Sequence, residues 1–157
     1  MAVALTISTL GEVAERSQLI ARGVRPSQLA AAIRSGSVTR VRRGWFATPS
    51  ASLEQLAAVR IGGRLGGMSA CETFGIWVPE SGAIHVSLCR NASRLRPSPT
   101  RGRPVILDWT SDPAHPDPWT SAWRVDLESA VAQCLRLLAV DEAVALLDSA
   151  LHARTLS

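Results

Sequence analysis

The stretch from Arg16 to Phe46 constrains the fold more than any other part of the chain. It contains a short helical pattern, a longer helical pattern, and then alternating apolar and basic residues that end at Gly44. Gly23 is expected just past the end of the first helix, and Pro26 at the first position of the second, where the missing N–H of proline costs nothing. This order predicts two helices that are joined by a tight turn and followed by a β-hairpin.

The second helix of this stretch is predicted to have an apolar and a polar face. Leu29, Ala32 and Ile33 recur at helical spacing, so we expect them to face a core. The residues on or near the opposite face form the candidate recognition surface, which consists of Arg25, Ser27, Gln28, Ala31 and Arg34. Side chains on the second helix of a helix-turn-helix are the ones that reach the edges of DNA bases.

The segment after this helix predicts a strand with a basic face. Residues 38–43 alternate with a period of two, which places Arg40 and Arg42 on one face, and Arg43 begins the turn at Gly44. Arginines on such a hairpin can hold DNA phosphates or reach into the minor groove. Alternatively, they only solvate an edge strand and discourage aggregation. The sequence contains no lysine, so the choice of arginine here does not distinguish the two roles.

These features are typical of a winged helix-turn-helix, which places one helix in the DNA major groove and a hairpin against the backbone. A helix within residues 1–15, with Ser8 or Thr9 as its N-cap, would complete the three-helix core. We therefore predict an α+β fold. Residues 1–48 would form a winged helix-turn-helix DNA-binding domain, and residues 49–157 a small mixed α/β domain.

Charge is unevenly spread along the chain, whose net charge is +4. Residues 1–60 contain eight Arg and three Glu, a net charge of +5. Residues 61–157 contain nine Arg and ten acidic residues, a net charge of −1. The positive field therefore belongs to the predicted winged helix, as expected for a part that binds a polyanion.

The second predicted domain mixes helical and strand patterns. Helices are predicted over residues 52–61, 68–75, 127–138 and 141–154. Strands are predicted around Ile84, Val105 and Trp123, and His85 is expected on the solvent face of the first of them. The glycine-rich segment 62–67 lacks the GxxxxGKS/T spacing of a phosphate-binding loop, so we expect it to serve close packing or a bend between helices.

No pattern in the sequence indicates catalysis or a bound cofactor. The three histidines, His85, His115 and His152, are scattered over a strand, a proline-rich segment and the last helix. The three cysteines lack metal-ligand spacing, and the apolar helical patterns around Cys71 and Cys134 favour buried free thiols. We therefore predict no catalytic residue, no metal site and no cofactor, and a protein that is not an enzyme.

The order of these patterns resembles a family that is common in actinobacteria. Its members begin with a winged helix similar to that of the AbiEi-type antitoxins of type IV toxin–antitoxin systems. Many of them continue into a domain that resembles very-short-patch-repair endonucleases. The resemblance covers nearly the whole chain, and the matching residues are Gln18-Leu19, Gly23-Val24, Arg40 to Phe46, Ser69-Ala70 through Gly75-Ile76-Trp77, Ile84-His85-Val86 and Leu127 to Val131.

This resemblance implies sequence-specific binding of double-stranded DNA, by a transcriptional repressor or an antitoxin-like autoregulator. Relatives with the nuclease domain extend well past the last helix. This sequence ends at Ser157 and has no lysine for the Asp…Glu-x-Lys arrangement of the nuclease. We therefore expect the DNA-binding and linking parts only. Two alternatives remain: a module that binds a toxin or nuclease partner and uses the winged helix as scaffold, or the non-catalytic part of a longer endonuclease.

The remaining features concern location and partners. The sequence has no basic leader and no apolar run of membrane-spanning length, so we expect a cytoplasmic protein without membrane contact. Trp109, Trp119 and Trp123 lie near acidic residues, which favours a protein partner over nucleic acid for that region. A single winged helix contacts few base pairs, so specificity requires a dimer or a contribution from the second domain, and the oligomeric state stays open.

Overall fold

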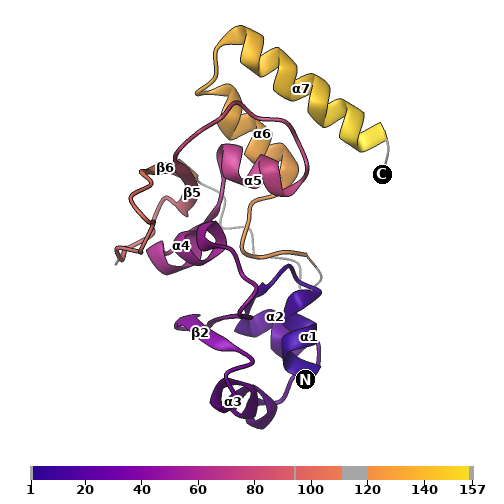
Figure 1. Cartoon of the computed structure of the whole chain (residues 1–157), viewed down its shortest axis with the longest axis vertical. Coiled ribbons are helices and arrows are strands. Elements are labelled where there is room, and N and C mark those ends of the chain that lie inside the picture. Colours follow the sequence, from indigo (N-terminus) through magenta and orange to yellow (C-terminus); the bar gives the residue numbers. More distant parts are fainter. Residues whose placement is uncertain (1, 94, 111–119, 156–157) are drawn as a thin grey trace.

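The computed structural model describes residues 2–93, 95–110 and 120–155, in which seven helices and two three-stranded sheets make a mixed α+β structure, as predicted. The molecule is elongated, with α3 near one end and α7 at the other (Figure 1). The first six elements are α1 (Ala2–Ser8), β1 (Val13–Glu15), α2 (Arg16–Ala21), α3 (Pro26–Arg34), β2 (Thr39–Arg42) and β3 (Trp45–Ala47). The others are α4 (Leu53–Ile61), β4 (Arg64–Leu65), α5 (Gly67–Thr73), β5 (Ile84–Cys89), β6 (Val105–Thr110), α6 (Leu127–Leu135) and α7 (Val140–Thr155).

The first six elements combine three helices with a small antiparallel sheet. The strand order is β1-β3-β2, and Phe46 of β3 pairs with Ala14 on one side and Arg40 on the other. The helices and the sheet bury one apolar cluster, made of Val3, Ile7, Leu10, Ala14, Leu19, Leu29, Ala32, Val38 and Phe46. Burial of these side chains is the main force that holds α3 against the hairpin.

The N-terminal segment differs from the single helix predicted for it. α1 ends at Ser8, so Ser8 and Thr9 lie at its C-terminal end and cap no helix start. Gly11 and Glu12 have positive φ values of 85° and 75°. Left-handed backbone cannot continue an α-helix, so these two residues redirect the chain into β1. The hydroxyls of Ser8 and Thr48 donate to the Glu12 carboxylate and hold the turn in place.

The turn between α2 and α3 has the predicted form. Gly23 has a φ of +78°, and the N–H groups of Gly23 and Val24 donate to the carbonyl oxygens of Ile20 and Leu19. A left-handed glycine with these bonds is a common helix ending. Pro26 is the first residue of α3, as predicted.

The second sheet has the strand order β4-β5-β6, with β5 antiparallel to β4 and parallel to β6. The strands predicted at Ile84 and Val105 are confirmed. The strand predicted around Trp123 is wrong, because that segment makes one isolated bridge to Leu65 within the described residues. The third strand is the two-residue β4, which lies inside the glycine-rich segment. All four helices predicted in this half are present, with ends that differ by at most three residues.

His85 is buried, whereas strand alternation predicted a solvent-facing side chain. The prediction is wrong because α4 and α5 both pack against β5, whose residues are buried along nearly its whole length. The ring Nε2 of His85 lies 3.3 Å from the hydroxyl of Ser81. Burial disfavours the charged imidazolium and lowers the pKa of His85 below its ordinary value of 6.5.

Mild acid is therefore expected to destabilise the protein. The unfolded chain takes up a proton at His85 more readily than the folded chain, so the free energy of unfolding decreases as the pH falls below 6.5. The pKa values of Glu54 and Asp126 are lowered from their ordinary values of 4.5 and 3.8, so protonation of these two carboxylates affects stability only at lower pH. Urea denaturation between about pH 7 and about pH 5 measures this decrease. The dependence should flatten in His85→Asn, and an unchanged slope would contradict the burial of His85.

A second core cluster joins the N-terminal sheet to the rest of the chain. Val13 of β1 and Ala47 of β3 pack with apolar side chains of α4, β4 and β5 and with Trp123. The indole N–H of Trp123 donates to the carbonyl oxygen of Leu10 at 2.8 Å. The domain boundary predicted after residue 48 falls between β3 and α4. This cluster contains residues from both sides of that boundary.

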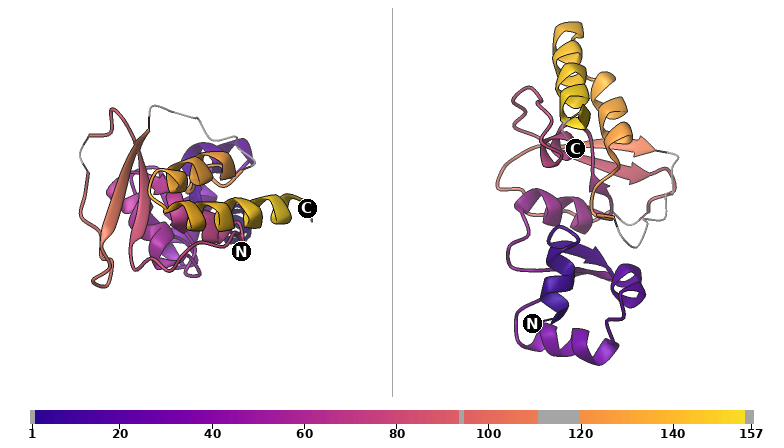
Figure 2. Two further views of the ribbon diagram at one scale, coloured as in Figure 1. Left: turned by 90° about the horizontal axis from the view of Figure 1, so that it is seen from above. Right: turned by 90° about the vertical axis from the view of Figure 1, so that its right-hand side faces the viewer.

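The third cluster lies among α5, α6 and α7 and contains two cysteines. Cys71 and Cys134 are buried, as predicted, and their sulfur atoms are 3.8 Å apart. Their mutual hydrogen bond and burial raise the pKa of Cys71, which keeps that thiol protonated. α6 and α7 lie side by side at this end of the molecule (Figure 2). None of the helices in the described ranges is long and apolar enough to cross a membrane.

Candidate nucleic-acid interface

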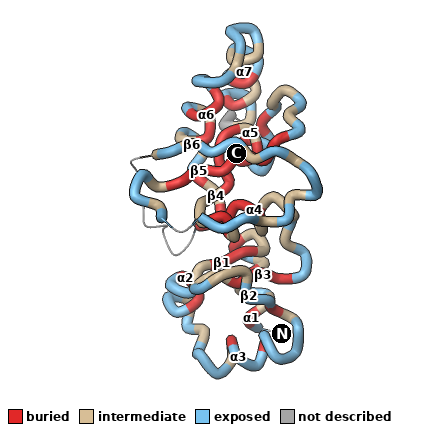
Figure 3. The backbone as a smooth tube through the Cα atoms, turned by 90° about the vertical axis from the view of Figure 1, so that its left-hand side faces the viewer, coloured by how far each residue is buried: buried red, intermediate tan, exposed pale blue. Residues whose placement is uncertain are grey.

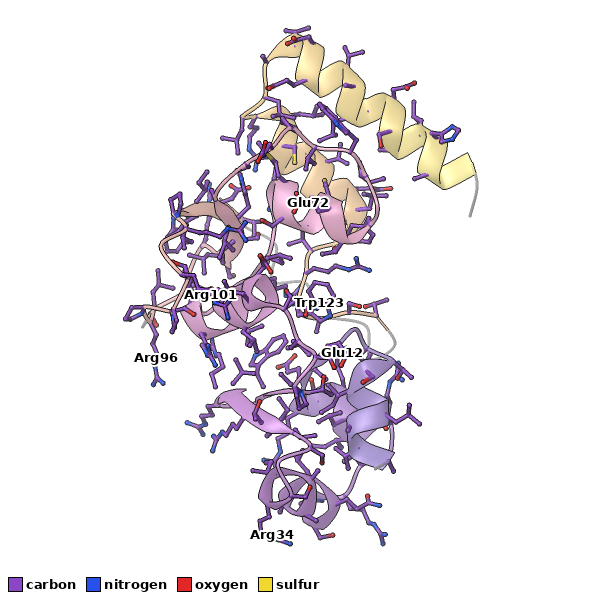
Figure 4. All side chains as sticks on the ribbon, viewed as in Figure 1. Glu12, Arg34, Glu72, Arg96, Arg101 and Trp123 are labelled. Carbon is purple, nitrogen blue, oxygen red and sulfur yellow. The ribbon has the colours of Figure 1, made fainter. Side chains whose placement is uncertain are left out.

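α3 presents its predicted polar face to solvent at one end of the molecule. Arg25, Ser27, Ala31 and Arg34 are exposed, and Gln28 is half-buried. Figure 3 shows exposed residues along most of α3. In Figure 4, Arg34 extends from the outer tip of the molecule, away from the other elements. The predicted recognition surface is thus accessible to a large partner.

Gln28 has a second role that the sequence analysis did not assign. Its Oε1 accepts a 2.9 Å hydrogen bond from the backbone N–H of Arg25, which caps the first turn of α3. A glutamine that recognises adenine uses both its amide oxygen and its amide nitrogen. In this structure the Oε1 atom of Gln28 is engaged in the cap, which orients the side chain along the first turn of α3.

A β-bulge sets the faces on which the hairpin arginines lie. Arg40 pairs with Phe46, but Arg42 pairs with the adjacent Trp45, so an extra residue lies between them in β2. Paired residues share a face of the sheet, and adjacent residues point to opposite faces. Arg40 and Arg42 therefore lie on opposite faces, which corrects the prediction of one shared basic face. Arg42 points toward α4, where its guanidinium donates to the carbonyl oxygen of Val59 at 3.2 Å.

Arg42→Ala is therefore expected to reduce stability and to leave binding of a polyanion unchanged. The carbonyl oxygen of Val59 belongs to the last turn of α4, where helix carbonyls have no partner within the helix. Loss of this hydrogen bond should cost about 1 kcal/mol of unfolding free energy. Thermal unfolding and titration with duplex DNA check the two halves of this prediction. A large loss of DNA affinity without loss of stability would contradict this prediction and show that Arg42 belongs to the interface.

Arg40 and Arg43 line an open hollow between α3 and the β2–β3 hairpin, about 410 Å³ in volume. A third arginine, Arg16 at the start of α2, lines the same hollow, and all three side chains are exposed. Ile33 lies here too and is exposed, so its predicted place in the core is wrong. Leu29, one turn earlier on the same side of α3, is buried in the core and borders the hollow as well.

Arg16 is the residue of this hollow that the sequence analysis missed. Its backbone N–H donates to the carbonyl oxygen of Gly44 at 2.7 Å, which places the start of α2 beside the turn of the hairpin. No local pattern signals this contact. The two residues are far apart in the sequence and meet because β1, which ends just before Arg16, pairs with β3.

The arginines of the hollow have no carboxylate partner among the described residues. The ion pairs found in residues 2–93, 95–110 and 120–155 lie elsewhere, and they are Arg103–Glu54 and Arg136–Asp108. Glu12 accepts hydrogen bonds from two hydroxyls in the α1–β1 turn. Glu15 pairs with Trp45 and so lies on the sheet face opposite to Arg40. The hollow therefore keeps a local positive charge that attracts anions.

Among the described residues, the others singled out by the sequence analysis are not gathered into a second site. Trp123 is buried, whereas Trp109 is exposed on the edge strand β6. Trp119 and His115 lie outside the described residues. In the part of the chain that the structure describes, no group of three or more His, Cys, Asp or Glu side chains is arranged to hold a metal ion.

No protein-family model matches the chain, and no curated protein is significantly similar to it. The resemblance to AbiEi-type antitoxins therefore rests on sequence patterns alone. The geometry of α3 and of the arginine-lined hollow is the basis on which a function can be proposed.

Proposed function

We propose that residues 1–48 form a winged helix-turn-helix that binds double-stranded DNA, and that the protein is a transcriptional repressor or an antitoxin-like autoregulator. Support comes from the element order α1-β1-α2-α3-β2-β3 and the sheet order β1-β3-β2, with the β2–β3 hairpin as the wing. The observation that carries the proposal is the hollow between α3 and this hairpin, which is lined by Arg16, Arg40 and Arg43.

In this proposal α3 is the recognition helix. An α-helix with its side chains is about 10–12 Å across, which fits the roughly 12 Å width of the DNA major groove. Ser27 and Ala31 face base edges. Arg25 and Arg34, at the two ends of the helix, reach bases or phosphates, and Gln28 offers one donor.

Arg16, Arg40 and Arg43 hold phosphates that flank the major groove. A guanidinium presents its N–H donors in a planar fork, which matches two phosphate oxygens. Each phosphate that is neutralised in this way releases counterions, so the affinity should fall steeply as salt increases. Arg42 is left out of this set because it is bound to the end of α4.

The first test is binding of the purified protein to the DNA upstream of its own coding sequence and to a scrambled duplex of equal composition, at two salt concentrations. A regulator should prefer the upstream DNA at both. Equal and salt-sensitive binding to both duplexes would reject the regulator and leave a nonspecific DNA-binding module. Absence of binding to either duplex would reject DNA binding itself.

A second candidate function is protein binding through residues 49–157. One observation favours it: α6 and α7 expose large apolar side chains at the end of the molecule opposite α3 (Figure 1). The two functions are compatible because the two surfaces are separate. A regulator of chromosomal genes would act in the cytoplasm.

A further inference from the structure

α7 has two apolar stripes, and only one of them is covered. Leu146 and Ala150 are buried in the cluster shared with α5 and α6. The second stripe is exposed and consists of Val140, Val144, Leu147 and Leu151, of which Val140 is 82% and Leu151 66% exposed. These residues recur at intervals of four, three and four, the spacing with which one helix contacts another.

The exposed stripe borders an apolar groove between α6 and α7. The groove is about 260 Å³ in volume, and its apolar walls are Leu127, Val131 and Leu135 of α6 and Leu147 and Leu151 of α7. Figure 2 shows the ribbons of the two helices side by side. Two adjacent helices with apolar facing edges provide the seat in which a third, amphipathic helix docks. Soluble proteins rarely leave a continuous apolar surface of this kind without an interaction to cover it.

Acidic side chains stand on both sides of this surface. Glu128 lines the groove on the side of α6. Asp141 and Asp148 each follow a residue of the exposed stripe by one position on α7, and they are therefore about 100° further round the helix. All three carboxylates are exposed. The arginine at the end of α6, Arg136, is ion-paired with Asp108.

The acidic rims decide which kind of partner fits. In a two-fold symmetric dimer each copy presents the same patch to the other. A second copy of this chain would therefore bring a second set of the same acidic rims, with its own Glu128, Asp141 and Asp148, to the interface, and this concentration of like charge is unfavourable. A helix with basic residues beside its apolar contacts would instead form attractive pairs along both rims.

We propose that the groove between α6 and α7 binds an amphipathic helix of another protein, with apolar residues at i, i+3 or i+4, and i+7, and with Arg or Lys on its flanks. The groove lies at the opposite end of the molecule from α3 (Figure 1). Such a partner can be bound together with DNA, and the proposal does not depend on DNA binding.

The test uses a fluorescein-labelled model peptide of Leu and Lys with this spacing, and fluorescence anisotropy of its binding to the full chain. Leu151→Ser should weaken binding about tenfold, or about 1.4 kcal/mol. Asp148→Lys should weaken it and reduce its salt dependence. Leu5→Ser is the matched control, since Leu5 is also 66% exposed but lies on α1 at the other end. A peptide of Leu and Glu with the same spacing should bind far more weakly than the Leu and Lys peptide.

Equal binding of the peptide to the wild-type protein and to Leu151→Ser would overturn the proposal, as would failure of the peptide to bind. A scrambled Leu and Lys peptide that binds as well as the helical one would overturn it too, because charge alone would then explain binding. Sedimentation equilibrium tests whether a second copy of the chain occupies the groove. A wild-type dimer that Leu151→Ser converts to a monomer would assign the groove to a second copy of the chain instead.

Discussion

Replacing Gly63 with alanine is expected to lower the free energy of unfolding by about 3 kcal/mol. For a chain of this length, that loss corresponds to a fall of roughly 6–12 °C in the midpoint of thermal unfolding. Gly63 lies just before β4, the strand that pairs with Val86 and Ser87 of β5. An alanine Cβ there would be 2.3 Å from the backbone oxygen of Ser87 and 2.8 Å from Cγ1 of Val86.

The expected loss is large because the closest atom belongs to backbone. A crowded side chain can rotate away, but the carbonyl of Ser87 is held by the sheet, so β4 itself must move. Movement of β4 breaks the pairing of Arg64 with Ser87 and of Leu65 with Val86. It also disturbs Leu65, whose N–H donates to the carbonyl oxygen of Trp123 at 2.7 Å.

Gly82→Ala is the matched control for this substitution. A Cβ at Gly82 would meet no heavy atom within 4 Å, and the residue does not need a left-handed backbone. The free energy of unfolding of Gly82→Ala should stay within about 0.5 kcal/mol of that of the wild-type protein. Circular dichroism during heating compares the two variants directly. Similar midpoints of thermal unfolding for Gly63→Ala and Gly82→Ala would contradict the close approach of β4 to β5.

Replacing both Arg40 and Arg43 with alanine is expected to reduce affinity for duplex DNA by about 10- to 100-fold at moderate salt. The slope of log affinity against log salt should become shallower by about 2, since two phosphate contacts are lost. Both side chains are exposed in the hollow beside α3, with no carboxylate partner among the described residues. The loss should therefore fall on binding and leave thermal unfolding nearly unchanged.

The control for this variant removes the same charge from another part of the molecule. Arg96 and Arg101 are exposed in the segment between β5 and β6, away from α3 (Figure 4). Because salt screens distant charges, replacing both with alanine should change DNA affinity by no more than about twofold. Equal losses in the two double variants would mean that only net charge matters, and the interface at α3 would then be wrong.

The sequence predicted the features of the N-terminal stretch that depend on residues close together in the chain. Gly23 and Pro26 set the boundary between α2 and α3 through their own backbone preferences. Gly44, with a φ of +83°, forms the hairpin turn in the same way. The exposure of Arg25 and Arg34 follows from helical periodicity around the buried Leu29 and Ala32, which also acts within one or two turns.

The interface itself was predicted only in part. The bulge in β2 moves Arg42 to the face that packs on α4, and strand alternation contains no signal for an inserted residue. Arg16 enters the hollow through its contact with Gly44, which requires the pairing of β1 with β3. β1 was not predicted, because the left-handed turn at Gly11 and Glu12 lies inside a segment whose sequence pattern indicated one helix.

By itself, then, the sequence determined the α+β class, the helices α2 to α7, the turn before α3 and the excess of arginine in the first 60 residues. Only the tertiary structure decided which arginines share the hollow, that His85 is buried, and that the stripe of Leu127, Val131 and Leu135 borders an open groove. The physical reason is the range of the forces involved. Capping, turns and periodicity act over a few residues, whereas strand pairing and burial depend on segments that meet only after the chain has folded.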